Sequence, residues 1–151
     1  KLYWLLAPRG QSGYAMHAIA AIDLAVWDIR ARSLGLPLWR LLGGSRNRVP
    51  TYATFGFGFF DQDQLVAAAR DWAGRGFRRL KMTVGNHALQ RRDEPRPLSR
   101  VIVEDEARVK AVRDAVGPDV ELCVDANCSL DAYHAARLAQ RLEETGLAFF
   151  E

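Results

Sequence analysis

Acidic side chains end two successive apolar runs in the C-terminal part of the sequence. Asp125 follows the run 120–124 and Glu151 follows the run 147–150, one helix and two turns later. If both runs are neighbouring parallel strands, the two carboxylates lie side by side and repel each other unless a cation lies between them. Oxygen ligands suit a hard ion such as Mg²⁺. A single aspartate there could equally be a helix N-cap or a turn residue. Two acids at equivalent positions favour a divalent metal site.

Other polar groups follow the same kind of apolar run. Lys81 and Thr83 lie at the end of the run 77–84, and Asn127 comes two residues after Asp125. The histidines have no histidine partner at metal-binding spacing, so we expect them to be structural or exposed; they are His17, His87 and His134. Cys123 has no evident base beside it, so we interpret it as a small interior hydrophobe rather than a nucleophile.

Alternating strands and helices must position these residues. Apolar spacings of three and four predict an amphipathic helix at 15–33, and Asp61 followed by Gln64 predicts a capping box at the start of another. We expect strands at 49–53, 77–84, 120–125 and 147–150, with helices at 15–33, 38–42, 61–74, 103–116 and 130–145. The segment 86–100, which contains four arginines, is an insertion after the second strand. It could hold a substrate, or be a solvated loop or a subunit contact.

The alternation of strand and helix predicts an α/β fold with parallel strands joined by right-handed crossovers. An open Rossmann sheet needs a G-x-G-x-x-G loop, but Gly56-Phe57-Gly58 continues into Phe59-Phe60-Asp61. A (β/α) barrel is therefore favoured, and its catalytic groups lie at the carboxyl ends of the strands. A whole barrel takes about 250 residues, so we expect a partial barrel.

Bulk composition excludes several classes of protein. The chain is 49% hydrophobic and 26% charged, as a soluble globular protein is. No apolar run approaches the roughly 20 residues of a membrane helix, and no signal peptide is evident. The net charge of +3 is mild, and the basic residues form no stripe with interleaved aromatics, so we expect no nucleic-acid partner. The two cysteines fit a reduced, cytoplasmic setting better than a disulfide framework.

Several stretches resemble the enolase superfamily, and most closely its mandelate racemase and muconate lactonizing branch. They are AAIDLAVWDI (20–29), LGLP (34–37), LLGG (41–44), VDANCSLD (124–131) and FFE (149–151). The resemblance covers nearly the whole chain in the right order, apart from 86–100. It implies that residues 1–48 are the C-terminal part of an α+β capping domain. Residues 49–151 would then be the first four strands of a TIM-type barrel.

The chemistry implied by the resemblance is removal of the proton α to a carboxylate. In that family Mg²⁺ stabilises the resulting enediolate, and Lys or His acts as base. Carried over by position, Asp125 and Glu151 are the first and second metal ligands. Asn127 reaches the substrate, and Lys81 matches the first lysine of a Lys-x-Lys motif. The implied partner is a small carboxylate, a sugar acid, and the full-length protein is implied to be a homo-oligomer.

One position departs from the family pattern. The second lysine of the motif, usually a base, is Thr83 here, and a neutral hydroxyl is a poor base at neutral pH. The departure disfavours a two-base racemase and favours a one-base acid-sugar dehydratase. A racemase, epimerase or cycloisomerase of the superfamily remains an alternative, as does a non-catalytic barrel fragment that binds a partner through 86–100. The third metal ligand and the base are expected outside this chain, so we expect the 151 residues alone to be inactive.

Overall fold

Helices make up most of the described residues among the first 49. The structure is a computed structural model that describes residues 1–9, 12–85 and 96–151, and it divides into the units Lys1–Val49 and Pro50–Glu151. The helices of the first unit are α1 (Leu2–Leu6), η1 (Ala7–Arg9), α2 (Tyr14–Ser33) and α3 (Leu38–Leu41). Helix α2 confirms the prediction for 15–33. Its apolar side chains Ile22, Val26 and Ile29 stay exposed, so this unit does not cover the predicted inner face. Across the described ranges, no helix is long and apolar enough to cross a membrane.

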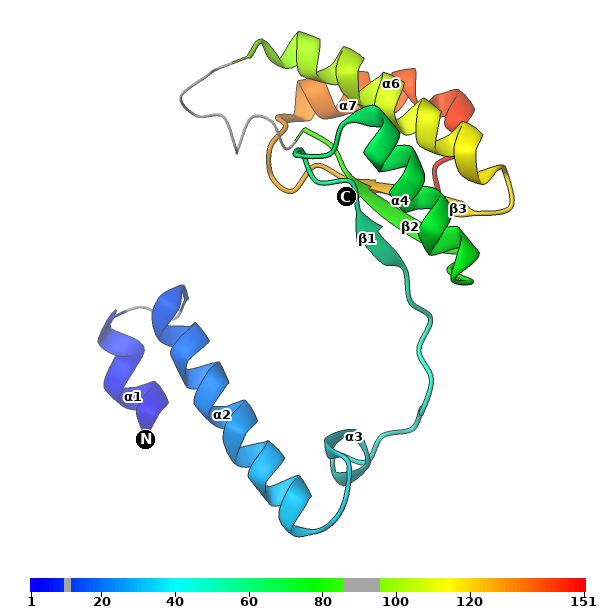
Figure 1. Ribbon diagram of the computed structural model, residues 1–151. Helices are drawn as coiled ribbons and strands as arrows, with labels where there is room; N and C mark the ends of the chain where they lie inside the picture. The colour runs from blue at the N-terminus through cyan, green and yellow to red at the C-terminus, as the bar shows by residue number, and fades with distance from the viewer. Residues whose placement is uncertain (10–11, 86–95) are drawn as a thin grey trace. The chain divides into compact units, whose positions relative to one another are not determined.

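The second unit is a parallel sheet with helices between its strands (Figure 1). The elements follow one another as β1 (Ala53–Phe55), α4 (Gln62–Gly74), β2 (Arg79–Thr83), α6 (Leu98–Val116), β3 (Glu121–Asp125), α7 (Ala132–Arg141), η2 (Glu143–Thr145) and β4 (Phe149–Phe150). The strands lie in the order β1-β2-β3-β4, and each is parallel to its neighbours. The predicted α/β class with parallel strands is confirmed.

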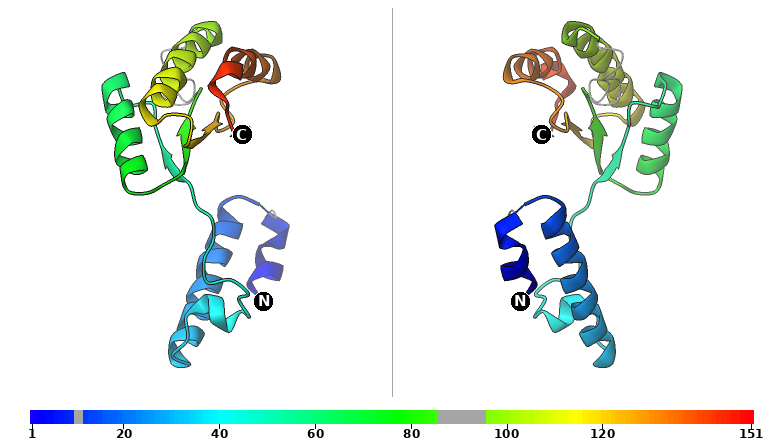
Figure 2. Two further views of the ribbon diagram at one scale, coloured as in Figure 1. Left: turned by 90° about the vertical axis from the view of Figure 1, so that its right-hand side faces the viewer. Right: turned by 90° about the vertical axis from the view of Figure 1, so that its left-hand side faces the viewer.

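The order of the strands distinguishes the two architectures that the sequence allows. A doubly wound sheet reverses its strand order at a switch point and carries helices on both faces. Here the order never reverses, and α4, α6 and α7 lie on one face of the sheet (Figure 2). This is the arrangement of one side of a (β/α) barrel, in which every crossover passes outside the sheet.

The two faces of the sheet carry different side chains because successive residues of a strand point to opposite sides. The face covered by the helices is apolar, and its fully buried members include Leu80, Met82, Val84, Leu122 and Val124. The other residues of β2 and β3 belong to the opposite face, which includes Lys81, Thr83, Cys123 and Asp125. The fully buried thiol of Cys123 fits the expected small interior hydrophobe.

Several predicted bounds of the elements were wrong. Strands β2 and β4 are shorter than the predicted 77–84 and 147–150, and α7 ends at Arg141, before the predicted end at 145. Helix α6 begins at Leu98, five residues before the predicted start, because Pro97 occupies its N-cap and Val101 and Ile102 already face the core. The end of the segment 86–100 is therefore the first turn of a helix, while 86–95 lies outside the described residues. Strand β1 begins at Ala53, where its pairing with Leu80 starts. Residues 49–52, which contain Pro50 and therefore lack one backbone donor, do not form a strand.

Side-chain hydrogen bonds fix one end of each of the three helices α4, α6 and α7. Gln64 N–H donates to Asp61 over 2.8 Å, and the Gln64 side chain accepts from Asp61 N–H, so the predicted capping box is confirmed. Asp131 caps α7 by accepting from His134 N–H, a cap that the sequence analysis missed. At the other end of α6, Arg113 donates to four carbonyl oxygens, those of Gly117, Val120, Thr145 and Gly146. It ties together the amino-terminal ends of β3 and β4.

Candidate active site

The two acidic residues singled out in the sequence lie at the same end of adjacent strands. Val124 pairs with Phe150, and the ladder continues past the strands because Ala126 N–H donates to the Glu151 carbonyl over 2.9 Å. Asp125 Oδ2 and Glu151 Oε2 both accept a hydrogen bond from Lys81 Nζ, each over 2.8 Å. The two carboxylate oxygens therefore lie within twice that distance of each other. The parallel pairing brings them together, as the sequence predicts.

Lys81 is the centre of this cluster. It lies on β2 with 7% of its surface exposed, and its ammonium group is 5.1 Å from the centre of the Tyr52 ring. Hydrogen bonds to Asp125 and Glu151 raise the pKa of Lys81 well above its usual value and outweigh the opposing effect of burial. Lys81 is thus a fixed positive charge at neutral pH and cannot accept a proton there. Its position suits stabilisation of negative charge on a bound molecule.

Asp125 is held in place from two sides. Burial by itself would raise its pKa, but hydrogen bonds from the Lys81 ammonium and from Asn127 N–H, the latter over 2.7 Å, bring the pKa below its usual value. The loop that supplies this N–H is strained, since Asn127 and Cys128 have φ angles of 45° and 62°. Asparagine tolerates this left-handed conformation better than most residues, whereas cysteine does not share that preference. The exposed Asn127 thus binds Asp125 through its backbone and keeps its side chain available.

Thr83 pairs with Asp125 across β2 and β3. Its side chain is buried, and its carbonyl oxygen accepts a hydrogen bond from Arg108. It therefore lies next to the cluster. The other titratable residues considered in the sequence lie elsewhere. His134 hydrogen bonds to Asp131 on α7, His17 is exposed in the first unit, and His87 lies outside the described residues.

Three residues near the cluster were not singled out from the sequence. Tyr52 precedes β1 and lies beside Lys81, and Asp105 and Arg108 form a buried ion pair on α6. The only sequence signal for the pair is its position, since two charged residues one turn apart lie on the side of the helix that carries Val101 and Val109. For Tyr52 no spacing or motif gave a signal.

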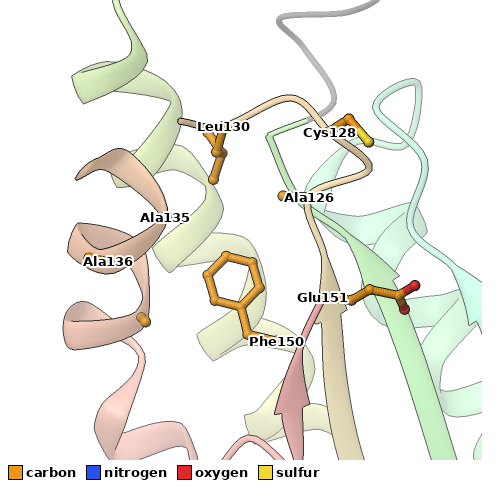
Figure 3. Close-up of a pocket in the computed structure, with 8 residues that line it drawn as sticks. Ala126, Cys128, Leu130, Ala135, Ala136, Phe150 and Glu151 are labelled. Carbon is orange, nitrogen blue, oxygen red and sulfur yellow. The ribbon is translucent and has the colours of Figure 1, made fainter. Parts of the chain in front are cut away.

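One cavity lies beside the carboxylate cluster, since Glu151 is among the residues that line it. It is an apolar groove of about 510 Å³ between α7 and β4, with Ala135, Ala136 and Ala139 along one wall and Phe150 along the other. Figure 3 shows Phe150 pointing toward α7 and Glu151 pointing to the opposite side of the sheet. Ala139, predicted to face inward, is exposed here because it lines this groove. The Glu151 carboxylate therefore lies on the other face of the sheet.

Comparison with known families covers most of the chain. Residues 64–151 match the family described as Enolase C-terminal domain-like, which is more than half of the sequence. The chain belongs to the enolase superfamily. Residues 1–43 match the N-terminal domain of mandelate racemase and muconate lactonizing enzyme, which places the chain in that branch. The resemblance seen in the sequence motifs is confirmed.

The enolase-superfamily relatives are named as dehydratases, cycloisomerases and epimerases. An arabinonate dehydratase from Saccharolobus solfataricus is 32% identical over 155 residues, which cover 100% of this chain and 38% of the relative. Other relatives are named as a talarate/galactarate dehydratase, a galactarolactone cycloisomerase and a dipeptide epimerase. This chain therefore spans little more than a third of the length of the arabinonate dehydratase.

Two solved structures of the superfamily share the fold over almost the whole chain. A 3,6-anhydro-D-galactonate cycloisomerase from Zobellia galactanivorans is 32% identical with a TM-score of 0.81, covering 99% of this chain and 38% of that one. An L-talarate dehydratase from Polaromonas, crystallised with Mg and L-glucarate, is 37% identical with a TM-score of 0.77, again covering 99% and 38%. Both likenesses confirm the partial enolase-superfamily fold.

The carboxylate cluster fits part of a site for Mg²⁺, the ion found in that dehydratase structure. Asp125 and Glu151 already hold one positive charge, the Lys81 ammonium, between their oxygens. Among the residues that the structure describes, no three His, Cys, Asp or Glu side chains gather as a metal-binding group. Asp125 and Glu151 would therefore supply two carboxylates of a larger set of oxygen ligands.

We expect the cluster to make stability depend on acid pH in the metal-free, full-length protein. Because the pKa of Asp125 is lower in the folded state, its interaction stabilises the protein above the unfolded-state pKa and is lost as pH falls through the folded-state pKa. The measurement is the free energy of unfolding of wild type and Asp125→Asn in EDTA, from neutral to strongly acidic pH. The difference between the two should shrink toward acid; a constant difference would contradict the assigned pKa shift.

Proposed function

We propose that this chain is part of a longer Mg²⁺-dependent enzyme that removes the proton α to the carboxylate of a sugar acid. The observation that carries the proposal is the pair of carboxylates at adjacent strand ends, with a buried ammonium between them. The dehydratases and isomerases among the relatives support the reaction class. The sugar-acid ligand of the similar dehydratase structure supports the substrate class.

Each residue of the cluster has a role that follows from its charge and position. Asp125 and Glu151 would hold the metal ion, and Asn127 N–H keeps the Asp125 carboxylate oriented. When bound, Mg²⁺ supplies positive charge where negative charge develops on the substrate. Lys81, protonated at neutral pH, adds a second positive charge on the same side. The Asn127 side chain, which is exposed beside the carboxylates, is placed to contact a hydroxyl or carboxylate of the substrate.

The identity of residue 83 favours dehydration over racemisation. Racemisation needs a base on each face of the substrate, and Thr83 cannot serve as one of them at neutral pH. In a dehydration, a single base takes the α proton, the β hydroxide leaves as water after protonation, and the resulting enol becomes a 2-keto acid. That sequence of steps asks nothing of Thr83, and we therefore favour it. The base would be supplied by a part of the enzyme beyond these residues.

Cycloisomerisation is the second candidate. The 3,6-anhydro-D-galactonate cycloisomerase structure has a TM-score of 0.81 with this chain, and a cycloisomerase also removes or adds a proton α to a carboxylate. The residues of the cluster serve both reactions equally. The two differ in what leaves the β carbon, so the products separate them.

The full-length protein should turn over a sugar acid only when a divalent ion is present. We expect a panel of aldonic and aldaric acids to yield a 2-keto acid with Mg²⁺ and none after removal of the ion with EDTA, with activity restored by added Mg²⁺. Mass spectrometry of the product distinguishes loss of water from rearrangement at constant mass. The isolated 151-residue chain, whose described residues supply two of the proposed carboxylate ligands, should show no turnover. Activity of the full-length protein that survives EDTA would contradict the proposal.

A further inference from the structure

The ion pair on α6 is the most deeply buried charged contact near the cluster. Asp105 is 0% exposed and Arg108 is 8% exposed. Arg108 Nη1 donates to Asp105 Oδ1 over 2.7 Å, one helical turn away. Burying a pair of charges removes both from water, and such pairs are often no more stabilising than apolar residues of similar volume. Net stability alone therefore gives little reason for the pair.

Three further hydrogen bonds of the pair go to the carboxyl ends of two strands. Arg108 Nη2 donates to the Gly56 carbonyl over 2.8 Å, directly after β1, and Nη1 donates to the Thr83 carbonyl over 3.3 Å at the end of β2. Asp105 Oδ2 accepts from Gly85 N–H over 2.6 Å, in the turn that follows β2. The pair thus sets the ends of β1 and β2 at the edge of the sheet where the carboxylate cluster lies.

The turn that Asp105 holds packs against the loop that follows Asp125. Gly85 has a φ of 65°, and a Cβ atom there would overlap the Ser129 hydroxyl. Ser129 in turn donates to the Ala126 carbonyl through its backbone N–H over 2.9 Å and also through its hydroxyl. A shift of Gly85 would therefore be passed to the loop 126–129. Asn127 N–H, which binds the Asp125 carboxylate, is part of that loop.

The backbone also connects β2 directly to Asp125. Thr83 pairs with Asp125, and Val84 N–H donates to the Asp125 carbonyl over 2.9 Å. Lys81, two residues before Thr83 on β2, donates a hydrogen bond to the Asp125 carboxylate. A change in where β2 ends would therefore alter both the backbone and the side-chain contacts of Asp125.

We propose that the Asp105–Arg108 pair is a positioning element that fixes the geometry of the Asp125 carboxylate for metal binding and turnover. It acts on Asp125 through Thr83, Gly85 and the loop 126–129. The inference rests on the proposed function for its catalytic consequence. Its structural consequence, the order of the Asn127 N–H, does not depend on that function.

The first test uses Asp105→Asn in the full-length protein, with Arg113→Lys as the matched control. Arg113 lies on the same helix and also binds carbonyl oxygens, but at the amino-terminal ends of β3 and β4, where barrel residues serve stability. Asp105→Asn should weaken Mg²⁺ binding and lower kcat by about tenfold, the lower end of the loss caused by removing a direct partner of a metal ligand, because Asp105 acts on Asp125 through other residues. Arg113→Lys should lower the midpoint of urea unfolding and leave both values within about twofold of wild type.

The second test separates positioning from stability. In Asp105→Leu/Arg108→Met, apolar side chains replace both charges, which should restore part of the stability lost in Asp105→Asn. Mg²⁺ affinity and kcat should stay low, because Gly85 N–H and the Thr83 carbonyl have lost their partners. Recovery of both values in the double variant would show that the pair is structural only, and would overturn the inference.

Hydrogen exchange of backbone amides supplies a readout that needs neither metal nor substrate. In the metal-free protein, the amides of Gly85 and Asn127 should exchange faster in Asp105→Asn than in wild type. Their exchange rates should not change in Arg113→Lys. If only the Gly85 amide exchanges faster, the inferred effect of the pair on the loop 126–129 is wrong. If wild type neither binds Mg²⁺ nor turns over a sugar acid, the proposed function fails, while the exchange of Asn127 still decides whether the pair orders that loop.

Discussion

Replacing Asp125 by asparagine in the full-length protein is expected to lower both Mg²⁺ affinity and turnover by more than about a hundredfold, the upper range for residues that only support a ligand. The substitution keeps the size of the side chain and one oxygen but removes the negative charge. A hard divalent ion depends on that charge, because it must give up water molecules to enter the site. Calorimetric titration with Mg²⁺ and steady-state kinetics measure the two effects, and Glu151→Gln should behave alike.

The matched control for this prediction lies on the same strand. Glu121 is at the other end of β3, on the same face of the sheet as Asp125, and is paired with Arg79. Glu121→Gln removes the same charge at the amino-terminal end of the strand, where barrel residues contribute to stability rather than to catalysis. It should leave Mg²⁺ affinity and turnover near wild type. Equal losses in Glu121→Gln and Asp125→Asn would show that charge in general, and no site at the strand ends, causes the effect.

The strand ends could be found from the sequence because they depend on local patterns. Apolar runs of four to six residues, glycines after the helices and the Asp61–Gln64 capping box all act within a few residues, and the parallel pairing then follows from the alternation of strand and helix. Once Asp125 and Glu151 end successive strands, their meeting at one edge of the sheet requires no further information. The site's two carboxylates could therefore be predicted before any coordinates.

The contacts of Lys81 and of the Asp105–Arg108 pair could not be predicted in the same way. They join residues 20 to 70 positions apart, and no periodicity records which side chain reaches which carbonyl. Helix α6 shows a related limit, since its first turn lies in a polar, arginine-containing stretch that resembles a loop when it is considered alone. Tertiary packing of Val101 and Ile102 decides where the helix begins.

Lys81→Met and Thr83→Ala should separate the role of charge from the role of position on β2. Lys81 binds the same carboxylate oxygens that a metal ion would, so its ammonium competes with Mg²⁺ for them. Removing it should leave Mg²⁺ affinity unchanged or higher. Turnover should nevertheless fall by about a hundredfold to a thousandfold, as it does when one group that stabilises developing negative charge is removed. This pattern differs from that of Asp125→Asn, in which affinity and turnover fall together.

Thr83→Ala removes only a neutral hydroxyl, two residues after Lys81 on the same face of β2. Turnover should fall by less than about tenfold, the size of one neutral hydrogen bond, and Mg²⁺ affinity should not change. Since Thr83 is already buried and pairs with Asp125 through its backbone, alanine keeps the strand in register. If Thr83→Ala abolished turnover as completely as Asp125→Asn, the hydroxyl would take part in the chemistry. The preference for a one-base dehydration, which rests on Thr83 being idle, would then have to be abandoned.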